Sequence, residues 1–159
     1  LDDYNSVLWQ FLDCVFLKSL SSCYEKFNFV IMIPEKIAFI LVLAFFLIVF
    51  IQSGADKVFD YKGNLSFLND LLGGFFSRPL IALALISVTI LELTSGILCL
   101  IGIVDAIFNA SYFIGQLGLI IGSVALLVLL FGQRVSKNYD GAKTIAIYFI
   151  LAMMGIVLA

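Results

Sequence analysis

The sequence contains no histidine, and this absence excludes much of the usual chemistry of membrane-bound enzymes. The chain lacks the common axial ligand of haem, the usual zinc ligand and the commonest general base near neutral pH. The three cysteines, Cys14, Cys23 and Cys99, form no CxxC pair. Their odd number and wide spacing argue against a disulfide framework or a thiolate metal site. We therefore expect no metal site and no cysteine-based redox mechanism.

Charged residues are also scarce, and they do not cluster. Nine basic and eleven acidic residues give a net charge of -2, with no basic patch of the kind that holds nucleic acid. The chain also shows no glycine loop for nucleotides, no serine-histidine-acid set and no carboxylate-rich metal cluster. We expect no nucleic-acid binding, no resident cofactor and no catalytic residue, so the chain is not predicted to be an enzyme.

Apolar residues are abundant instead. They make up 63% of the 159 residues, the mean hydropathy is +1.16, and only 13% of residues are charged, against about 25% in ordinary soluble domains. A soluble domain cannot hide that much apolar surface, whereas a lipid bilayer solvates it. The composition predicts a single-domain integral membrane protein whose first partner is the bilayer.

Four apolar segments are long enough to cross about 30 Å of hydrocarbon. They are residues 37–54, 79–103, 112–132 and 143–159. We predict an all-α, four-helix transmembrane bundle over residues 32–159. Residues 1–31 form a separate segment with one apolar helical face, which predicts an extra amphipathic helix. This segment need not belong to the native core, because Met32 is a possible natural start.

The segment between the first two spans, residues 56–79, is mixed in character. Its apolar residues recur at partly helical spacing beside asparagine and aspartate, which indicates a short helix at the membrane interface. A loop whose apolar residues cap the bundle fits the same pattern. These apolar residues are Leu65, Phe67, Leu68, Leu71, Leu72, Phe75 and Phe76.

Basic residues predict the orientation. Three lie between the first and second spans, three lie between the third and fourth, and none lies between the second and third. By the positive-inside rule both basic loops are cytoplasmic and both termini are external, across a bacterial plasma (inner) membrane. Lys18, Lys26 and Lys36 oppose this orientation. The six loop residues are Lys57, Lys62, Arg78, Arg134, Lys137 and Lys143.

Glu92 lies about midway through the second span, where a charged side chain costs about 3 kcal/mol. Counted from the helix ends, Lys57 lies about 20 Å away along the membrane normal, so we expect no ion pair. An unpaired carboxyl group in lipid would be neutral and would donate a hydrogen bond, for which Ser123 has a suitable depth. Two roles remain open: a site for protons or for a ligand headgroup, and a purely structural bond between helices.

The third span carries the small-xxx-small pattern Gly118 to Gly122 beside Ser123, which allows close approach of another backbone. Packing within the bundle and packing between two copies are both compatible with it, so the oligomeric state stays open. The polar loop from Gln133 to Asp140 reads as a solvated hairpin or as a docking point for a partner.

Three short motifs resemble the DoxX family of four-span membrane proteins. They are Gly54-Ala55-Asp56-Lys57 after the first span, Glu92 to Gly96 with Gly102 in the second, and Phe131-Gly132-Gln133-Arg134 after the third. The resemblance covers residues 33–159 and implies that Gly54, Lys57, Glu92 and Gly96 form the family's motif positions. The basic residue that the family often has after the second span is missing from residues 103–106.

Relatives in this family include the membrane subunit of a thiosulfate:quinone oxidoreductase and a protein needed for methylamine utilisation. The resemblance therefore implies a non-catalytic subunit or scaffold for a quinone-linked redox system, with an oxidoreductase as partner and a quinone contact near Glu92. The alternative that the residues themselves suggest is a small-solute or proton carrier that uses Glu92.

Overall fold

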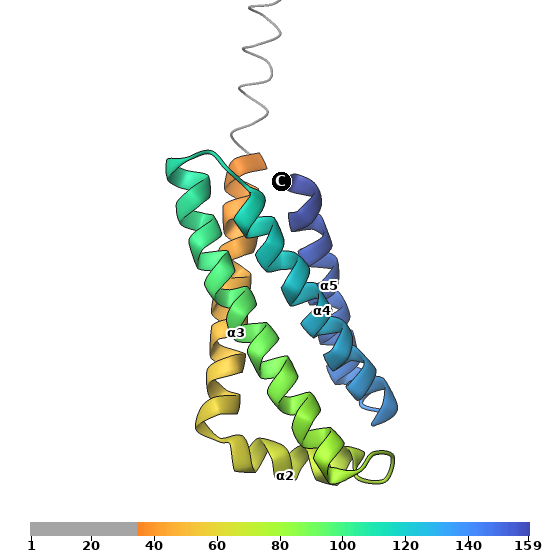
Figure 1. The fold of residues 1–159 in the computed structure, drawn as a ribbon. Coiled ribbons are helices and arrows are strands. Elements are labelled where there is room, and N and C mark those ends of the chain that lie inside the picture. The colour runs from red at the N-terminus through yellow and green to blue at the C-terminus, as the bar shows by residue number, and fades with distance from the viewer. Residues whose placement is uncertain (1–34) are drawn as a thin grey trace, which may run out of the picture. The chain divides into compact units, whose positions relative to one another are not determined.

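The computed structural model describes residues 35–159 as a bundle of helices. Four long helices and one short helix follow one another along the chain, and the described residues form no strand (Figure 1). The predicted all-α class is confirmed. The predicted amphipathic helix over residues 1–31 lies outside the described residues, and all packing below belongs to the compact unit of residues 38–159.

Within residues 35–159, four helices are long and apolar enough to cross a membrane, as predicted. A helix of about 20 residues spans about 30 Å, and the shortest of the four has 20 residues. This supports a multi-pass membrane protein. The four are the first helix, Glu35–Phe59, then α3, Arg78–Phe108, α4, Phe113–Val135, and α5, Tyr139–Leu158.

Helix α5 begins earlier than predicted. The predicted boundary was residue 143, but the helix starts at Tyr139, because the side chain of Asn138 accepts a hydrogen bond from the Gly141 backbone N–H at 3.2 Å. An asparagine in this position satisfies one of the free N–H groups of the first turn. This cap gives the fourth span its full length.

The segment after the first helix forms a short helix, α2, Tyr61–Leu72, so the helical alternative is confirmed and the loop alternative is wrong. Asp60 caps it by accepting a hydrogen bond from the Gly63 N–H at 3.1 Å. In Figure 1, α2 runs across the lower end of the bundle between the first helix and α3. It therefore covers that end of the space between the long helices.

The first helix contacts the three other long helices. Phe39, Leu43, Phe46 and Phe50 recur every three to four residues along one face, and each is at most 1% exposed. On α4, Gly115 lies against Phe39 and Leu43. On α5, Tyr148 meets Phe45 edge to face, with ring centroids 5.4 Å apart. This phenylalanine stripe forms the centre of the core.

Helices α3 and α4 meet along a seam of small residues. Gly102 lies against the backbone of Gly115, a Cβ on Gly118 would lie 3.1 Å from the Cys99 nitrogen, and Gly122 lies against Ser95. Small residues at helix contacts in membranes allow this close approach. Because Ser95, Cys99 and Phe50 cover Gly118 and Gly122, a dimer through this face would have to displace them.

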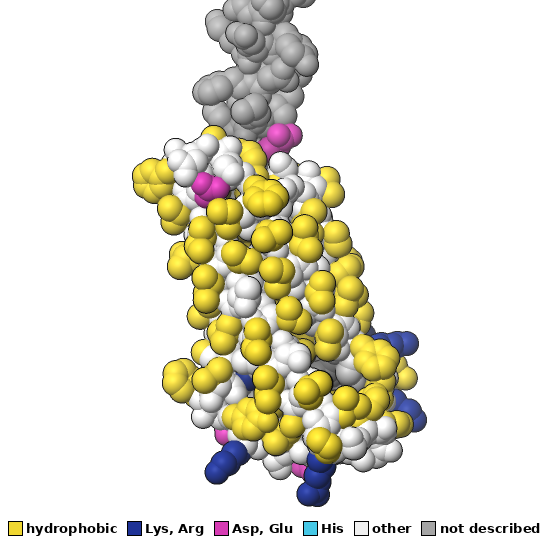
Figure 2. Space-filling model, viewed as in Figure 1, with side chains coloured by type: hydrophobic (Ala, Val, Ile, Leu, Met, Phe, Trp, Pro, Cys, Tyr) yellow, Lys and Arg dark blue, Asp and Glu magenta, His cyan; other side chains and the backbone are white. Residues whose placement is uncertain are grey.

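The outer surface is apolar over most of its length (Figure 2). Leu83 and Ile150, for example, are 64% and 60% exposed, which suits side chains that contact lipid. Lysine and arginine side chains gather at the end where α2 lies. Both basic loops are therefore at one end of the bundle.

Candidate functional site

A buried ion pair joins the first helix to α3. The Nζ of Lys57 lies 2.8 Å from Oε2 of Glu92 and 3.1 Å from Oε1. The side chain of Glu92 is 1% exposed and that of Lys57 is 15% exposed. Two charges removed from water need such close partners, because an unpaired charge in this environment is very costly.

Ser53 completes the network, one helical turn from Lys57. Its hydroxyl donates to Glu92 Oε1 at 3.2 Å and accepts from Lys57 Nζ at 2.6 Å, and its carbonyl oxygen lies 3.2 Å from the same Nζ. A lysine ammonium has three N–H donors. Ser53 and Glu92 therefore occupy the hydrogen-bonding capacity of Lys57.

The prediction that Lys57 and Glu92 lie too far apart to pair is wrong. Gly54 lies against Leu93 and Gly96 lies against Ile51, so in this antiparallel register Lys57 is level with residue 90, two residues from Glu92. The prediction placed the start of the second span beside the end of the first, whereas the first twelve residues of α3 extend past the level of Lys57.

The direction of the side chains accounts for the remaining offset of two residues. Side chains on a helix lean toward its N-terminus. Because the first helix and α3 are antiparallel, Lys57 and Glu92 lean toward each other. Lys57 thus reaches into the bundle, where a lysine near a helix end would otherwise extend toward the interface.

Ser123 does not accept a hydrogen bond from Glu92, so that prediction is also wrong. The Ser123 hydroxyl donates to the Leu119 carbonyl oxygen within α4 at 2.8 Å. The serine that does connect helices is Ser95, whose hydroxyl donates to the Gly118 carbonyl oxygen at 2.7 Å in the buried α3–α4 seam.

These two serines give a matched prediction. We expect Ser95→Ala to lower the free energy of unfolding by about 1 kcal/mol, because a buried bond between helices is lost. Ser123→Ala should cost less than about 0.5 kcal/mol, because its bond stays within one helix. Equilibrium unfolding in mixed micelles measures both. Equal losses would contradict a special role for the bond between helices.

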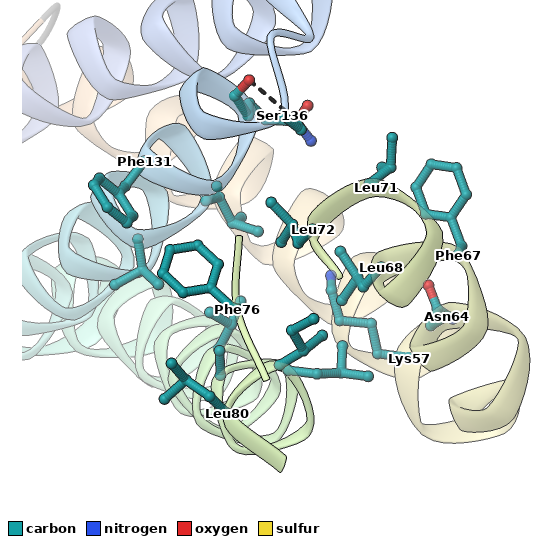
Figure 3. A pocket seen from close by; sticks show the side chains of 18 of the residues that line it. Lys57, Asn64, Phe67, Leu68, Leu71, Leu72, Phe76, Leu80, Phe131 and Ser136 are labelled. Atoms are coloured by element: carbon teal, nitrogen blue, oxygen red, sulfur yellow. Dashed lines mark hydrogen bonds between the residues drawn. The ribbon is translucent and has the colours of Figure 1, made fainter. Parts of the chain in front are cut away.

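A cavity of about 530 Å³ opens beside the ion pair (Figure 3). That volume lies in the usual range for small-molecule sites, about 300–1,000 Å³. Its walls are mostly apolar, while Ser53 and Lys57 line it at the first helix and Gln133 and Ser136 line it at α4. Glu92 does not belong to the lining and lies behind Lys57.

Five helices contribute to this cavity. The seam of small residues holds α3 against α4 as far as Ser95 and Gly122, and the cavity lies in the part of the bundle toward α2. The apolar lining comes from α2 to α5 and from the turn before α3. It comprises Phe67, Leu68, Leu71, Leu72, Phe76, Leu80, Ile81, Ala84, Leu85, Val88, Val128, Leu129, Phe131 and Ile145, with Gly132.

The four motif residues share one place in the fold. Gly54 and Gly96 let the first helix and α3 approach closely beside the Lys57–Glu92 pair. The sequence did not reveal the cavity, because the apolar residues of α2 were interpreted only as a helix face or a cap.

Among residues 35–159, no three metal-ligating side chains come together. Comparison with protein families, curated proteins and solved structures finds no match to this chain.

Proposed function

We propose that this protein is a non-catalytic membrane subunit or scaffold that holds a lipid-soluble quinone for a redox partner. The observation that carries the proposal is the apolar cavity beside the buried Lys57–Glu92 pair. The resemblance to the DoxX family supports it, because one relative in that family is the membrane subunit of a thiosulfate:quinone oxidoreductase. A subunit that only holds the quinone needs no redox group of its own.

The cavity offers a quinone two kinds of contact. Apolar side chains, with Phe67, Phe76 and Phe131 among them, suit a ring and the first part of a prenyl chain. Lys57 supplies a hydrogen-bond donor for a carbonyl oxygen. Such an oxygen would replace the Ser53 carbonyl, which is the most distant oxygen bonded to Lys57 Nζ, at 3.2 Å.

The ion pair weighs against the alternative, a proton or small-solute carrier that uses Glu92. A carrier needs a carboxyl group that meets its substrate, whereas Glu92 is 1% exposed and held between Lys57 and Ser53. Proteoliposomes distinguish the two functions. A carrier would dissipate an imposed pH gradient, and its Glu92→Gln variant would not.

The membrane and the orientation belong to the same proposal. The protein lies in a bacterial plasma membrane, with the end that carries α2 and both basic loops in the cytoplasm. The cavity lies near this end, so a redox partner that draws on the bound quinone would dock from the cytoplasmic side. The turn between α4 and α5 is part of that surface, and Arg134 in the last turn of α4 lies over the ring of Tyr139, 5.2 Å from its centroid.

Narrowing the cavity should weaken quinone binding. Ala84 lines the cavity, and an indole ring at this position would occupy part of its volume. We expect Ala84→Trp to weaken binding of decylubiquinone at least about tenfold, because well-packed space rejects a ligand of that size. Isothermal titration of the protein in nanodiscs measures this affinity.

The neighbouring residue supplies the control for this variant. Leu83 is 64% exposed on the outer surface and does not belong to the lining, so Leu83→Trp should leave the affinity unchanged. If the unaltered protein binds no more quinone than empty nanodiscs do, the proposed quinone site is wrong. The subunit role is tested by purification from native membranes: no co-purifying oxidoreductase, with unchanged quinone-linked oxygen uptake in a deletion strain, would contradict it.

A further inference from the structure

The cavity presents a cation whose charge is already balanced. Among the residues that line it, all of them within the described part of the chain, Lys57 alone is charged. Its ammonium group lies 2.8 Å from the Glu92 carboxylate, which packs behind it and away from the cavity. A ligand in the cavity therefore meets a hydrogen-bonding group with no net charge.

We infer that Glu92 sets the charge selectivity of the cavity: by neutralising Lys57, it admits uncharged lipid-soluble molecules and rejects anionic amphiphiles such as fatty acids. The inference rests on the proposed function, since it takes the cavity as a ligand site. A bilayer surrounds the protein with amphiphiles, many of which carry an anionic headgroup. An unpaired lysine at the end of an apolar cavity would bind those groups in preference to a neutral quinone.

The geometry explains how Glu92 exerts this effect without contacting the ligand. An anionic headgroup that bonds to Lys57 Nζ must lie close to the carboxylate on the other side of the same ammonium group. Like charges at such separations repel strongly away from bulk water. A carbonyl oxygen carries no net charge and avoids this repulsion. Glu92 is thus a positioning residue that acts through Lys57.

A matched pair of probes tests the charge alone. Dibromostearic acid and its methyl ester have the same chain, and bromine quenches tryptophan fluorescence on contact. Phe76→Trp places a reporter in the lining at a half-buried position, and Trp9→Phe removes the only tryptophan of the 159 residues. Ile147→Trp, in the same background, reports quenching from bulk lipid, because Ile147 is 64% exposed and does not line the cavity.

In nanodiscs at alkaline pH, where the acid is ionised, we expect the ester to quench Phe76→Trp saturably. The acid should bind at least about tenfold more weakly. Glu92→Gln should raise the affinity for the acid at least about tenfold. The ester should then no longer bind more tightly than the acid. If Glu92 had only a structural role, Glu92→Gln would weaken the binding of both probes. Tighter binding of the acid without tighter binding of the ester is therefore the signature of charge selectivity.

Each contrary outcome has a separate meaning. Equal binding of acid and ester by the parent protein overturns the inference, even where Glu92→Gln does not fold. An unchanged affinity for the acid in a folded Glu92→Gln protein overturns it as well, and in both cases a quinone site can stand. If neither probe quenches Phe76→Trp beyond the level of Ile147→Trp, the inference fails, and the quinone titration decides separately whether the proposed function fails with it.

Discussion

Replacing Gly102 by alanine should lower the free energy of unfolding by about 2–3 kcal/mol and the midpoint of thermal unfolding with it. A Cβ at this position would meet the backbone of Gly115 on α4 at less than contact distance. Backbone atoms of a helix cannot rotate away as a side chain can, so α3 and α4 must move apart. Thermal unfolding of the purified protein, followed by circular dichroism, measures the change.

The same substitution at an open position on α4 is the control. A Cβ at Gly132 would meet nothing within 4 Å, so Gly132→Ala gains helix propensity and adds no overlap. We expect this variant to be unchanged or up to about 1 kcal/mol more stable. If Gly102→Ala and Gly132→Ala behaved alike, the close contact between α3 and α4 would not exist as described.

The helices were predictable because their signal is local. An uncharged run of the length of residues 37–54 predicts a membrane span, and Pro79 marks the first turn of the second span. The start of the fourth span was misplaced by four residues, since the first turn of α5 is polar. Hydropathy alone cannot show that Asn138 caps a helix there.

The ion pair was not predictable from span boundaries, although both partners were identified. The depth of a residue was counted from the apparent end of its own helix, but α3 has 31 residues and the first helix has 25 within the described chain. Only the contacts of Gly54 and Gly96 fix the register between them. The two glycines were visible in the sequence, while the partner of each was not.

The cavity lies beyond sequence reasoning for a related reason. Its lining comes from five helices, and each apolar lining residue resembles any other apolar residue of a membrane protein. What creates the space is an arrangement: small residues hold α3 to α4 on one side of the ion pair, and α2 covers the bundle on the other. The Lys57–Glu92 pair lies where these two regions meet. Substitutions in the pair should therefore affect both the stability of the bundle and the cavity.

Removing Lys57 tests how much the ion pair stabilises the bundle. We expect Lys57→Met to lower the free energy of unfolding by about 3–5 kcal/mol, because it leaves the carboxylate of Glu92 buried without its cation. Methionine retains the unbranched apolar stem, so the loss reports the charge more than the packing. Equilibrium unfolding in mixed micelles measures the difference.

The double variant Lys57→Met/Glu92→Met distinguishes the loss of the ion pair from the cost of leaving one buried charge unpaired. Replacing both charges by apolar side chains of similar size should recover most of the stability that the single substitution removes. The coupling energy of this cycle should therefore exceed about 1 kcal/mol, which lies within the range of about 0.5–3 kcal/mol for residues in contact. Additive losses would mean that the two side chains do not pair in the membrane, and the basis for a charge-balanced cavity would then be gone.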